Sequence, residues 1–342
     1  MPRSTEVNAD EMTIQTALSE TIDKSFEVRP AGTRGEVSFE LALVHAGRTA
    51  VECRYEIAGR DDAPVIVVAG GISAGRHVIA NSADASAGWW QEQAASFERC
   101  RVVAIDWIGS DGSLDCPIDP IDQANVLALL LDALGIDRVA AFIGASYGAM
   151  VGQQLAVHFP GRCGAILSFS AGASAHPFSS ACRSLQRKAV AIAEAGGDPA
   201  AGVALARALA MLTYRTADEY RVRFDAAPSV ADGNVRVSAE DYLDAQGERY
   251  AARTTGAAYR RLSESIDLHR VDPAALRLPA TFVAVESDWL VPIEDIRALA
   301  EAVPGARFVL MPSLYGHDGF LKEEAQVATI ITEFLAALEP AR

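Results

Sequence analysis

The chain has 342 residues, of which 50% are hydrophobic and 22% are charged. This composition excludes intrinsic disorder for most of the chain and predicts a globular protein with one large core or two modest ones. The net charge of -15 argues against a nucleic acid or an anionic membrane as partner, because an acidic surface repels phosphate groups.

No segment predicts a membrane span or a secretion signal. No apolar run approaches the roughly 20 residues that cross a bilayer, and no apolar stretch follows Arg3 at the N-terminus. We therefore expect a cytoplasmic protein. The five cysteines are odd in number, widely spaced and without a CxxC pair, which favours buried free thiols over disulfides or a zinc site.

In chain order, a loose polar arm is expected over residues 1–30. Two β-rich runs then flank Gly47-Arg48-Thr49 and predict an antiparallel hairpin that turns at these residues. A series of short, almost wholly apolar runs follows at 65–70, 101–106, 139–144, 165–170, 281–286 and 307–312. Because these runs lack alternation, they predict strands buried on both faces.

Helix-like segments separate most of these strands. They lie at 89–97, 121–134, 147–158, 293–302 and 321–338. The alternation predicts an α/β fold with a mostly parallel, doubly wound sheet. Between Ser170 and Thr281 the patterns are helical, with no convincing strand. We therefore expect a helical lid at 173–273, inserted into a core formed by 31–172 and 274–342.

The stretch Gly144-Ala145-Ser146-Tyr147-Gly148 lies between a predicted buried strand and a predicted helix. This is the context that the G-x-S-x-G nucleophile elbow requires. Small flanking residues permit the tight turn, which would place the Ser146 hydroxyl at a helix N-terminus whose dipole favours negative charge. We expect Ser146 to be a nucleophile; a plain glycine-rich turn is the alternative.

A serine nucleophile needs a base, and the base needs an acid to orient it. Of the six histidines, His317 is the best placed, because it lies in the loop between a predicted strand and the last helix. The acid should follow a strand between the serine and the histidine, where Asp288 lies; Glu286, within the strand, is the rival. The order Ser146, Asp288, His317 predicts an α/β-hydrolase fold. A surface-loop histidine and a helix-capping aspartate are the alternatives.

Attack on a carbonyl also requires N–H donors for the oxyanion. The backbone of Tyr147 is one candidate, because this residue follows the nucleophile. The second donor should come from the loop at 69–73 after the first central strand, where Ile72 is favoured over Gly71. An ordinary Gly-Gly turn is the alternative.

These residues resemble the homoserine O-acyltransferase family of α/β-hydrolase-fold enzymes, which transfer an acyl group from acyl-CoA to homoserine in methionine biosynthesis. The likeness spans roughly residues 35–340 and is most specific at YGHDGFL, residues 315–321. It implies that Asp318 binds the amino group of homoserine, and that Arg207 and Tyr214, two helical turns apart, bind its carboxylate. A surface arginine with a core tyrosine is the alternative, and Arg215 is the nearest substitute.

The chain departs from the family pattern at the elbow and at the oxyanion loop, which reads GGISAGRH. These departures leave the identity of the acyl donor and the acceptor open. Leu290, at a position that bears on donor choice in the family, offers no charge to a succinyl carboxylate and weakly favours acetyl. Arg76 is a candidate contact for a succinyl carboxylate or a CoA phosphate, with a solvated side chain as the alternative.

The resemblance implies an O-acyltransferase with a ping-pong Ser-His-Asp mechanism, in which acetyl-CoA or succinyl-CoA is the co-substrate. We expect no bound metal or other cofactor, and small-molecule partners only; a homodimer and serine as acceptor stay open. The main alternative is an esterase or thioesterase that uses the same triad with water as acceptor. A hydrolase-fold binding protein without catalysis is the third class.

Overall fold

A sheet of eight strands forms the centre of the fold, and the computed structural model describes residues 32–338. Its strands are β1 (Arg34–Leu43), β2 (Gly47–Ala58), β3 (Val65–Ala69), β4 (Arg101–Ile105), β5 (Ala141–Ala145), β6 (Ile166–Phe169), β9 (Ala280–Val285) and β10 (Arg307–Met311). They lie in the order β1-β2-β4-β3-β5-β6-β9-β10, with antiparallel pairing only at β1-β2 and β2-β4 among these strands. The predicted mostly parallel sheet is confirmed. The predicted arm at 1–30 lies outside the described residues.

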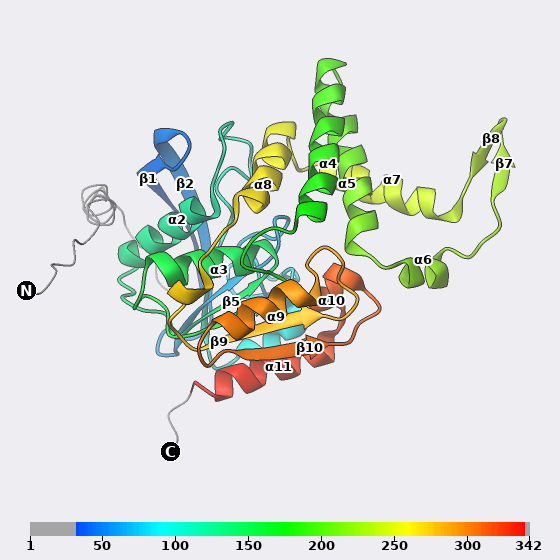
Figure 1. The fold of residues 1–342 in the computed structure, drawn as a ribbon. Helices are drawn as coiled ribbons and strands as arrows, with labels where there is room; N and C mark the ends of the chain where they lie inside the picture. The colour runs from blue at the N-terminus through cyan, green and yellow to red at the C-terminus, as the bar shows by residue number, and fades with distance from the viewer. Residues whose placement is uncertain (1–31, 339–342) are drawn as a thin grey trace, which may run out of the picture.

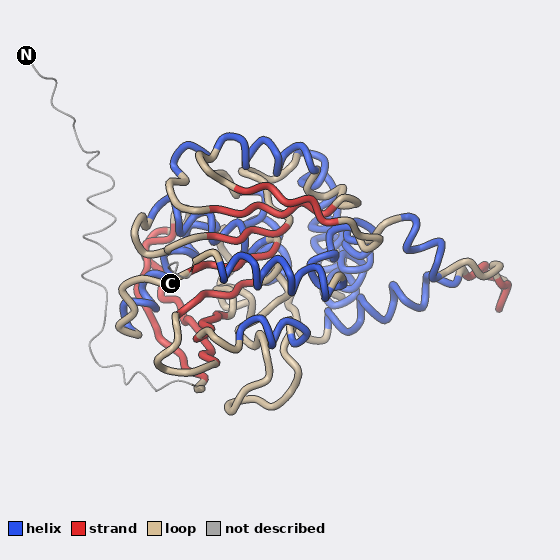
Figure 2. Tube along the Cα trace, turned by 90° about the horizontal axis from the view of Figure 1, so that it is seen from below, coloured by secondary structure: helices blue, strands red, loops and turns tan. Residues whose placement is uncertain are grey.

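Helices cover both faces of this sheet (Figures 1 and 2). One face carries α2 (Pro120–Ala133), α3 (Tyr147–His158) and α9 (Ile293–Ala302), and the other carries the 3₁₀ helix η1 (Gln91–Phe97) and α11 (Glu324–Ala336). Each layer buries its own cluster of apolar side chains against the sheet. This is the doubly wound arrangement predicted from the alternation of strands and helices.

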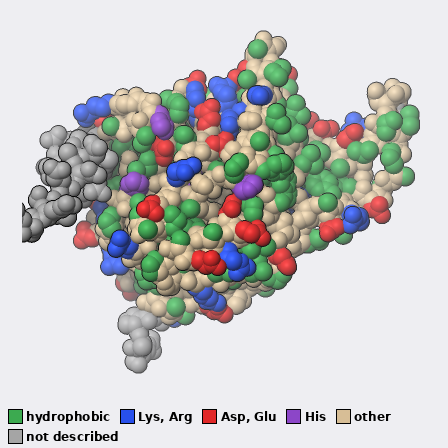
Figure 3. All heavy atoms as spheres, in the orientation of Figure 1, with side chains coloured by type: hydrophobic (Ala, Val, Ile, Leu, Met, Phe, Trp, Pro, Cys, Tyr) green, Lys and Arg blue, Asp and Glu red, His purple; other side chains and the backbone are tan. Residues whose placement is uncertain are grey.

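Between β6 and β9 the chain forms a largely helical region, which we call the α4–α8 segment. It contains α4 (Pro177–Ala195), α5 (Pro199–Tyr214), α6 (Ala217–Arg223), β7 (Ser229–Ala231), β8 (Asn234–Arg236), α7 (Ser238–Ala251) and α8 (Gly256–Leu268). In Figure 1, α6 and the β7-β8 hairpin extend away from the sheet, and Figure 3 shows hydrophobic side chains exposed over this part of the molecule. Within residues 32–338, no helix is long and apolar enough to cross a membrane.

The predicted hairpin is present, but its turn lies earlier than predicted. Leu43 pairs with Gly47, so residues 44–46 form the turn and Gly47 begins β2. Gly47 has φ +70°, a left-handed conformation that glycine adopts without strain and that closes three-residue hairpin loops. The turn prediction at Gly47-Arg48-Thr49 is therefore wrong.

Two further element predictions need correction. The interval predicted to lack strands contains the β7-β8 hairpin, whose Asp232-Gly233 turn is a strong hairpin signal between strands too short to show alternation. The helix predicted at 321–338 is split into α10 (Gly319–Lys322) and α11. The break lies at Glu323, whose φ of -88° and ψ of 59° are not helical.

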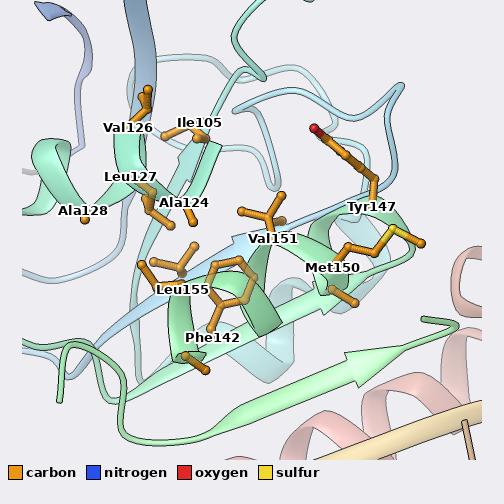
Figure 4. Packing of buried hydrophobic residues seen from close by; sticks show 14 of the residues in the cluster. Ile105, Ala124, Val126, Leu127, Ala128, Phe142, Tyr147, Met150, Val151 and Leu155 are labelled. Carbon is orange, nitrogen blue, oxygen red and sulfur yellow. The ribbon is translucent and has the colours of Figure 1, made fainter. Parts of the chain in front are cut away.

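The core beside Ser146 is built on β5 and α3 (Figure 4). Phe142 of β5 is 1% exposed and lies beside Val151 and Leu155 of α3. A Cβ at Gly152 would come within 2.6 Å of the Phe142 ring, so the glycine lets the helix lie directly on the aromatic ring. This packing fixes α3 on the sheet.

We predict that Phe142→Ala lowers the free energy of unfolding by about 3–5 kcal/mol, because the truncation leaves a cavity beneath α3. Urea denaturation would measure this loss, with the dependence of the unfolding free energy on urea concentration expected to stay unchanged. Ile192→Ala on α4 is the control, since Ile192 is 75% exposed and should change stability by less than about 0.5 kcal/mol. Equal losses in the two variants would contradict the packing described here.

Candidate active site

Ser146 lies in the sharp turn between β5 and α3, with φ 53° and ψ -119°. This conformation is strained for a residue with a side chain, and it is the conformation of a nucleophile elbow. A Cβ at Gly148 would lie 2.2 Å from the carbonyl oxygen of Ala69, and a Cβ at Gly144 would lie 2.6 Å from the backbone of Ala149. Both glycines of the motif are therefore required by close backbone approach.

The structure brings Ser146, His317 and Asp288 into one hydrogen-bonded chain. Nε2 of His317 lies 2.8 Å from Oγ of Ser146, and Nδ1 lies 2.7 Å from Oδ2 of Asp288. The other carboxylate oxygen of Asp288 accepts the backbone N–H groups of Leu290 (2.9 Å) and Val291 (3.2 Å). With Nδ1 donating to the carboxylate, Nε2 is left to accept the serine proton.

The loop after β9 distinguishes the two acidic candidates. Glu286 was predicted to lie within the strand. The strand ends at Val285, so Glu286 follows it and this prediction is wrong. Glu286 is exposed, whereas Asp288 is 4% exposed and faces His317. The position within the loop therefore decides which carboxylate reaches the imidazole.

Burial and neighbouring charge shift the pKa of His317 in opposite directions. Burial lowers the pKa of the imidazole, but the charge and hydrogen bond of Asp288 raise it, and the pKa lies above its usual value. The pKa of Asp318 is raised by burial, and the charges of Arg215, His317 and Arg207 partly offset this rise. Both side chains therefore depend on their charged neighbours for their protonation states.

The hydroxyl of Ser146 opens into a cavity of about 260 Å³. Core residues and residues of the α4–α8 segment both line it, among them Gly71 and Ile72 from the loop after β3, Ser179 and Arg183 from α4, and Tyr259 and Ser263 from α8. The α4–α8 segment thus supplies much of the wall opposite the nucleophile.

The predicted oxyanion donors lie around the nucleophile. Tyr147 follows Ser146 directly, and its buried hydroxyl lies 2.6 Å from Oγ of Ser265, which holds the start of α3 in place. A Cβ at Gly71 would lie 3.9 Å from Cβ of Ser146, and Ile72 also lines the cavity. The carbonyl of Gly71 accepts the indole N–H of Trp107 (3.1 Å), which fixes the loop.

The three residues expected to bind the acceptor also meet at this cavity. Arg207, Tyr214 and Asp318 all line it. The guanidinium of Arg207 lies over the rings of Tyr214 (5.4 Å) and Tyr250 (4.9 Å), and its Nε is buried without a hydrogen-bond partner among the described residues. The ring of Tyr214 lies 5.9 Å from that of His317.

The two expected donor contacts are placed differently. Leu290 is buried and lines the cavity. Arg76 is not among the residues that line it; its backbone N–H donates to Asp106 (2.8 Å), and its Nε lies 3.7 Å from the same carboxylate. A donor contact by Arg76 stays a prediction that this pairing does not favour.

Sequence reasoning missed Arg183, which lines the cavity from α4. Its guanidinium lies 2.6 Å from Oδ1 of Asp267, and Arg187 lies 2.8 Å from the other oxygen of the same carboxylate. The signal was available, because two arginines four residues apart share one face of a helix in an otherwise acidic chain.

The remaining site predictions concern metals and thiols. Among residues 32–338, no group of three or more His, Cys, Asp or Glu side chains could hold a metal ion. All five cysteines are free, but the prediction that they are buried is wrong for Cys116 and Cys182, which are partly exposed. Cys182 lines the cavity.

Comparison with known proteins identifies the family to which the sequence is similar. The sequence matches the α/β-hydrolase fold family over residues 64–324. It is 47% identical to a homoserine O-succinyltransferase of Xanthomonas campestris pv. campestris, over 90% of this chain and 85% of that protein. It is 32% identical to a serine O-succinyltransferase of Litchfieldella anticariensis, over 84% of this chain and 92% of that protein.

Solved structures give the same fold. A homoserine O-acetyltransferase of Bacillus anthracis superposes with a TM-score of 0.79, over 90% of this chain and 98% of that chain, at 16% identity. The predicted α/β-hydrolase fold is confirmed. The identity and coverage of the relatives carry the assignment further: the chain belongs to the homoserine O-acyltransferase family of α/β-hydrolase-fold enzymes.

Proposed function

We propose that this protein transfers an acyl group, preferentially succinyl, from acyl-CoA to the hydroxyl of L-homoserine. The observation that carries the proposal is the chain Asp288–His317–Ser146, with Ser146, His317 and Asp318 all lining one cavity. The names of the relatives, homoserine O-succinyltransferase and serine O-succinyltransferase, support the reaction class.

In the first half-reaction, Nε2 of His317 takes the proton of Ser146 as Oγ attacks the thioester carbon. The backbone N–H groups of Tyr147 and of Ile72, or of Gly71 in its place, stabilise the oxyanion. The C–S bond then breaks, His317 returns the proton to the CoA sulfur, and an acyl-serine remains. The same histidine next accepts the proton of the homoserine hydroxyl as its oxygen attacks the acyl carbon. The bond between that carbon and Oγ of Ser146 then breaks, and His317 returns the proton to Oγ.

The acceptor is a zwitterion and requires charges of both signs. Asp318 is suited to its ammonium group, and Arg207 with Tyr214 is suited to its carboxylate, as the resemblance implied. We further propose that residues 173–273 act as a lid on a core formed by 31–172 and 274–342. Such a lid would keep water from the acyl-serine and so favour transfer over hydrolysis.

The charges that line the cavity favour a succinyl donor. Two arginines, Arg183 and Arg207, line the cavity with one aspartate, Asp318, so its lining has one more positive than negative side chain. Homoserine would occupy Arg207 and Asp318 with its own two charges. Arg183, which shares Asp267 with Arg187, then remains for a second carboxylate, and a succinyl group carries one. Leu290, the basis of the weak acetyl preference, offers no such charge, and the donor choice stays a prediction.

We predict that Ser146→Ala reduces CoA release at least about a thousandfold while the thermal unfolding midpoint stays unchanged. Free thiol is followed with succinyl-CoA or acetyl-CoA, with and without L-homoserine or L-serine. Multiple-turnover release that requires the acceptor indicates a transferase, whereas equal multiple-turnover release without acceptor would indicate a hydrolase. Ser184→Ala on α4 is the control, because its hydroxyl donates to the backbone of its own helix.

The second prediction concerns pH. His317 must be neutral to act as base, so kcat/KM for the donor should fall as the pH drops through its raised pKa. Asp288→Asn removes the charge that raises this pKa, so the acid limb should move to lower pH. The same variant should lower kcat about 10⁴-fold, because the asparagine amide no longer holds His317 in the tautomer that accepts the serine proton at Nε2. A shift of the limb to higher pH would contradict the role given to Asp288.

The third prediction concerns the donor. Arg183→Met should raise KM for succinyl-CoA by about tenfold or more, the equivalent of one charge-assisted hydrogen bond. KM for acetyl-CoA should change by less than about threefold. Arg187→Met is the matched control, because Arg187 shares Asp267 but is not among the residues that line the cavity. An equal loss with both donors would reject Arg183 as the succinyl contact.

A further inference from the structure

Arg215 lies directly after α5 and connects two parts of the site. Its side chain is 10% exposed, and its Nε lies 3.0 Å from Oδ2 of Asp318. Its Nη1 donates to Oε1 of Glu219 at 2.6 Å. Glu219 is 4% exposed, and it also accepts Nη1 of Arg223 at 3.0 Å. The side chains therefore form a line from α6 to the cavity.

The backbone around Arg215 is fixed against the catalytic loop. Oγ1 of Thr216 donates to the carbonyl of Leu314 at 2.6 Å. A Cβ at Gly316, which has φ +60°, would lie 2.6 Å from the carbonyl oxygen of Tyr214. The end of α5 thus contacts the loop that carries the catalytic histidine, and Arg215 is held at a defined distance from Asp318.

Charges alternate in sign along this line. Arg223 is followed by Glu219, Arg215 and Asp318, and Asp318 lines the cavity. A cation in the cavity beside Asp318 would continue this alternation, and the ammonium group of an amino-acid acceptor is such a cation. Nε of Arg215 is buried and makes no directed hydrogen bond to a described residue, so the ion pair leaves Asp318 oxygens able to accept from a ligand.

The charged groups that face Asp318 come from three elements. They are His317 on its own turn, Arg215 and Arg207 from α5 and its end, and Glu219 from α6. Burial favours the neutral acid, and Arg215 opposes burial more strongly than His317 or Arg207 does. A neutral Asp318 would bind an ammonium group poorly.

We infer that Arg215 is a positioning residue for the acceptor: it keeps the Asp318 carboxylate in place and ionised to bind the ammonium group, and Glu219 holds Arg215. This inference rests on the proposed function and adds to it the residue on which recognition of the amino group depends. Arg215 itself does not contact the acceptor in this arrangement, because Glu219 and Asp318 engage its guanidinium.

The test compares two acceptors that differ only in the amino group, L-homoserine and 4-hydroxybutanoate. Arg215→Met should raise KM for homoserine at least about tenfold. It should change kcat/KM for 4-hydroxybutanoate, or its inhibition constant against homoserine, by less than about twofold. CoA release in a single turnover without acceptor should also stay within about twofold, because the donor half-reaction does not use Asp318.

Companion variants distinguish loss of the Arg215 charge from loss of folding. Arg215→Lys keeps the cation and should recover most of the affinity for homoserine. Glu219→Gln, which loosens Arg215, should show a smaller loss in the same direction and keeps the inference testable if Arg215→Met fails to fold. Arg221→Gln is the matched control, because Arg221 lies on α6, is 72% exposed and pairs only locally with Asp218 among the described residues.

A pH series gives a readout that a merely structural contact would not change. His317 serves both acceptors, so its titration cancels in the ratio of kcat/KM for homoserine to that for 4-hydroxybutanoate. Loss of the Arg215 charge raises the pKa of Asp318, so in Arg215→Met the ratio should fall more than in the wild-type protein as the pH is lowered, and recover as the pH is raised.

The outcomes are distinct. An Arg215→Met loss that is equal for both acceptors, or that does not change with pH, would overturn the inference while the transferase function stands. A wild-type protein whose multiple-turnover release of CoA does not depend on an acceptor would overturn the proposed function and this inference with it.

Discussion

The strained backbone at Ser146 is the constraint on which the site depends. A residue at φ 53° and ψ -119° is held there only because the surrounding structure fixes it. That fixation comes from β5 in the centre of a parallel sheet, from α3 packed on Phe142, and from Gly148 against the carbonyl of Ala69. The core therefore determines where the hydroxyl points, and His317 and Asp288 arrive on loops at the same edge of the sheet.

The α4–α8 segment contributes a different kind of interaction. The core supplies the hydrogen-bonded chain of the triad, whereas α4 and α5 supply the cations Arg183 and Arg207 that line the cavity. The two lining arginines thus lie on different elements from the triad, whereas Asp318 directly follows His317 in the chain. A change in the segment away from Ser265, whose Oγ lies 2.6 Å from the Tyr147 hydroxyl, can alter the lining of the cavity while the elbow keeps its contacts with the sheet.

The sequence permitted the triad to be predicted, because each member has a local signal: glycines around Ser146, a strand end before Asp288, and a loop before the last helix for His317. Arg183 had a weaker signal, its spacing of four residues from Arg187, which indicates a shared helix face but not what that face lines. Its place in the cavity depends on how α4 packs against α5 and α8, which is a property of tertiary packing and not of local spacing. The hairpin turn at 44–46 was misplaced for a related reason, because register and not composition selects the turn residues.

For a chain with a net charge of -15, the proposed anionic CoA ester presents an electrostatic difficulty. The overall field repels such a donor, and screening limits that repulsion to about 8–10 Å at physiological ionic strength. Binding must therefore be decided by local charge, and here the cations that line the cavity outnumber its lining anion. Burial strengthens each of these interactions relative to the surface field. The acidic exterior serves solubility, whereas a few desolvated arginines would set which anions enter.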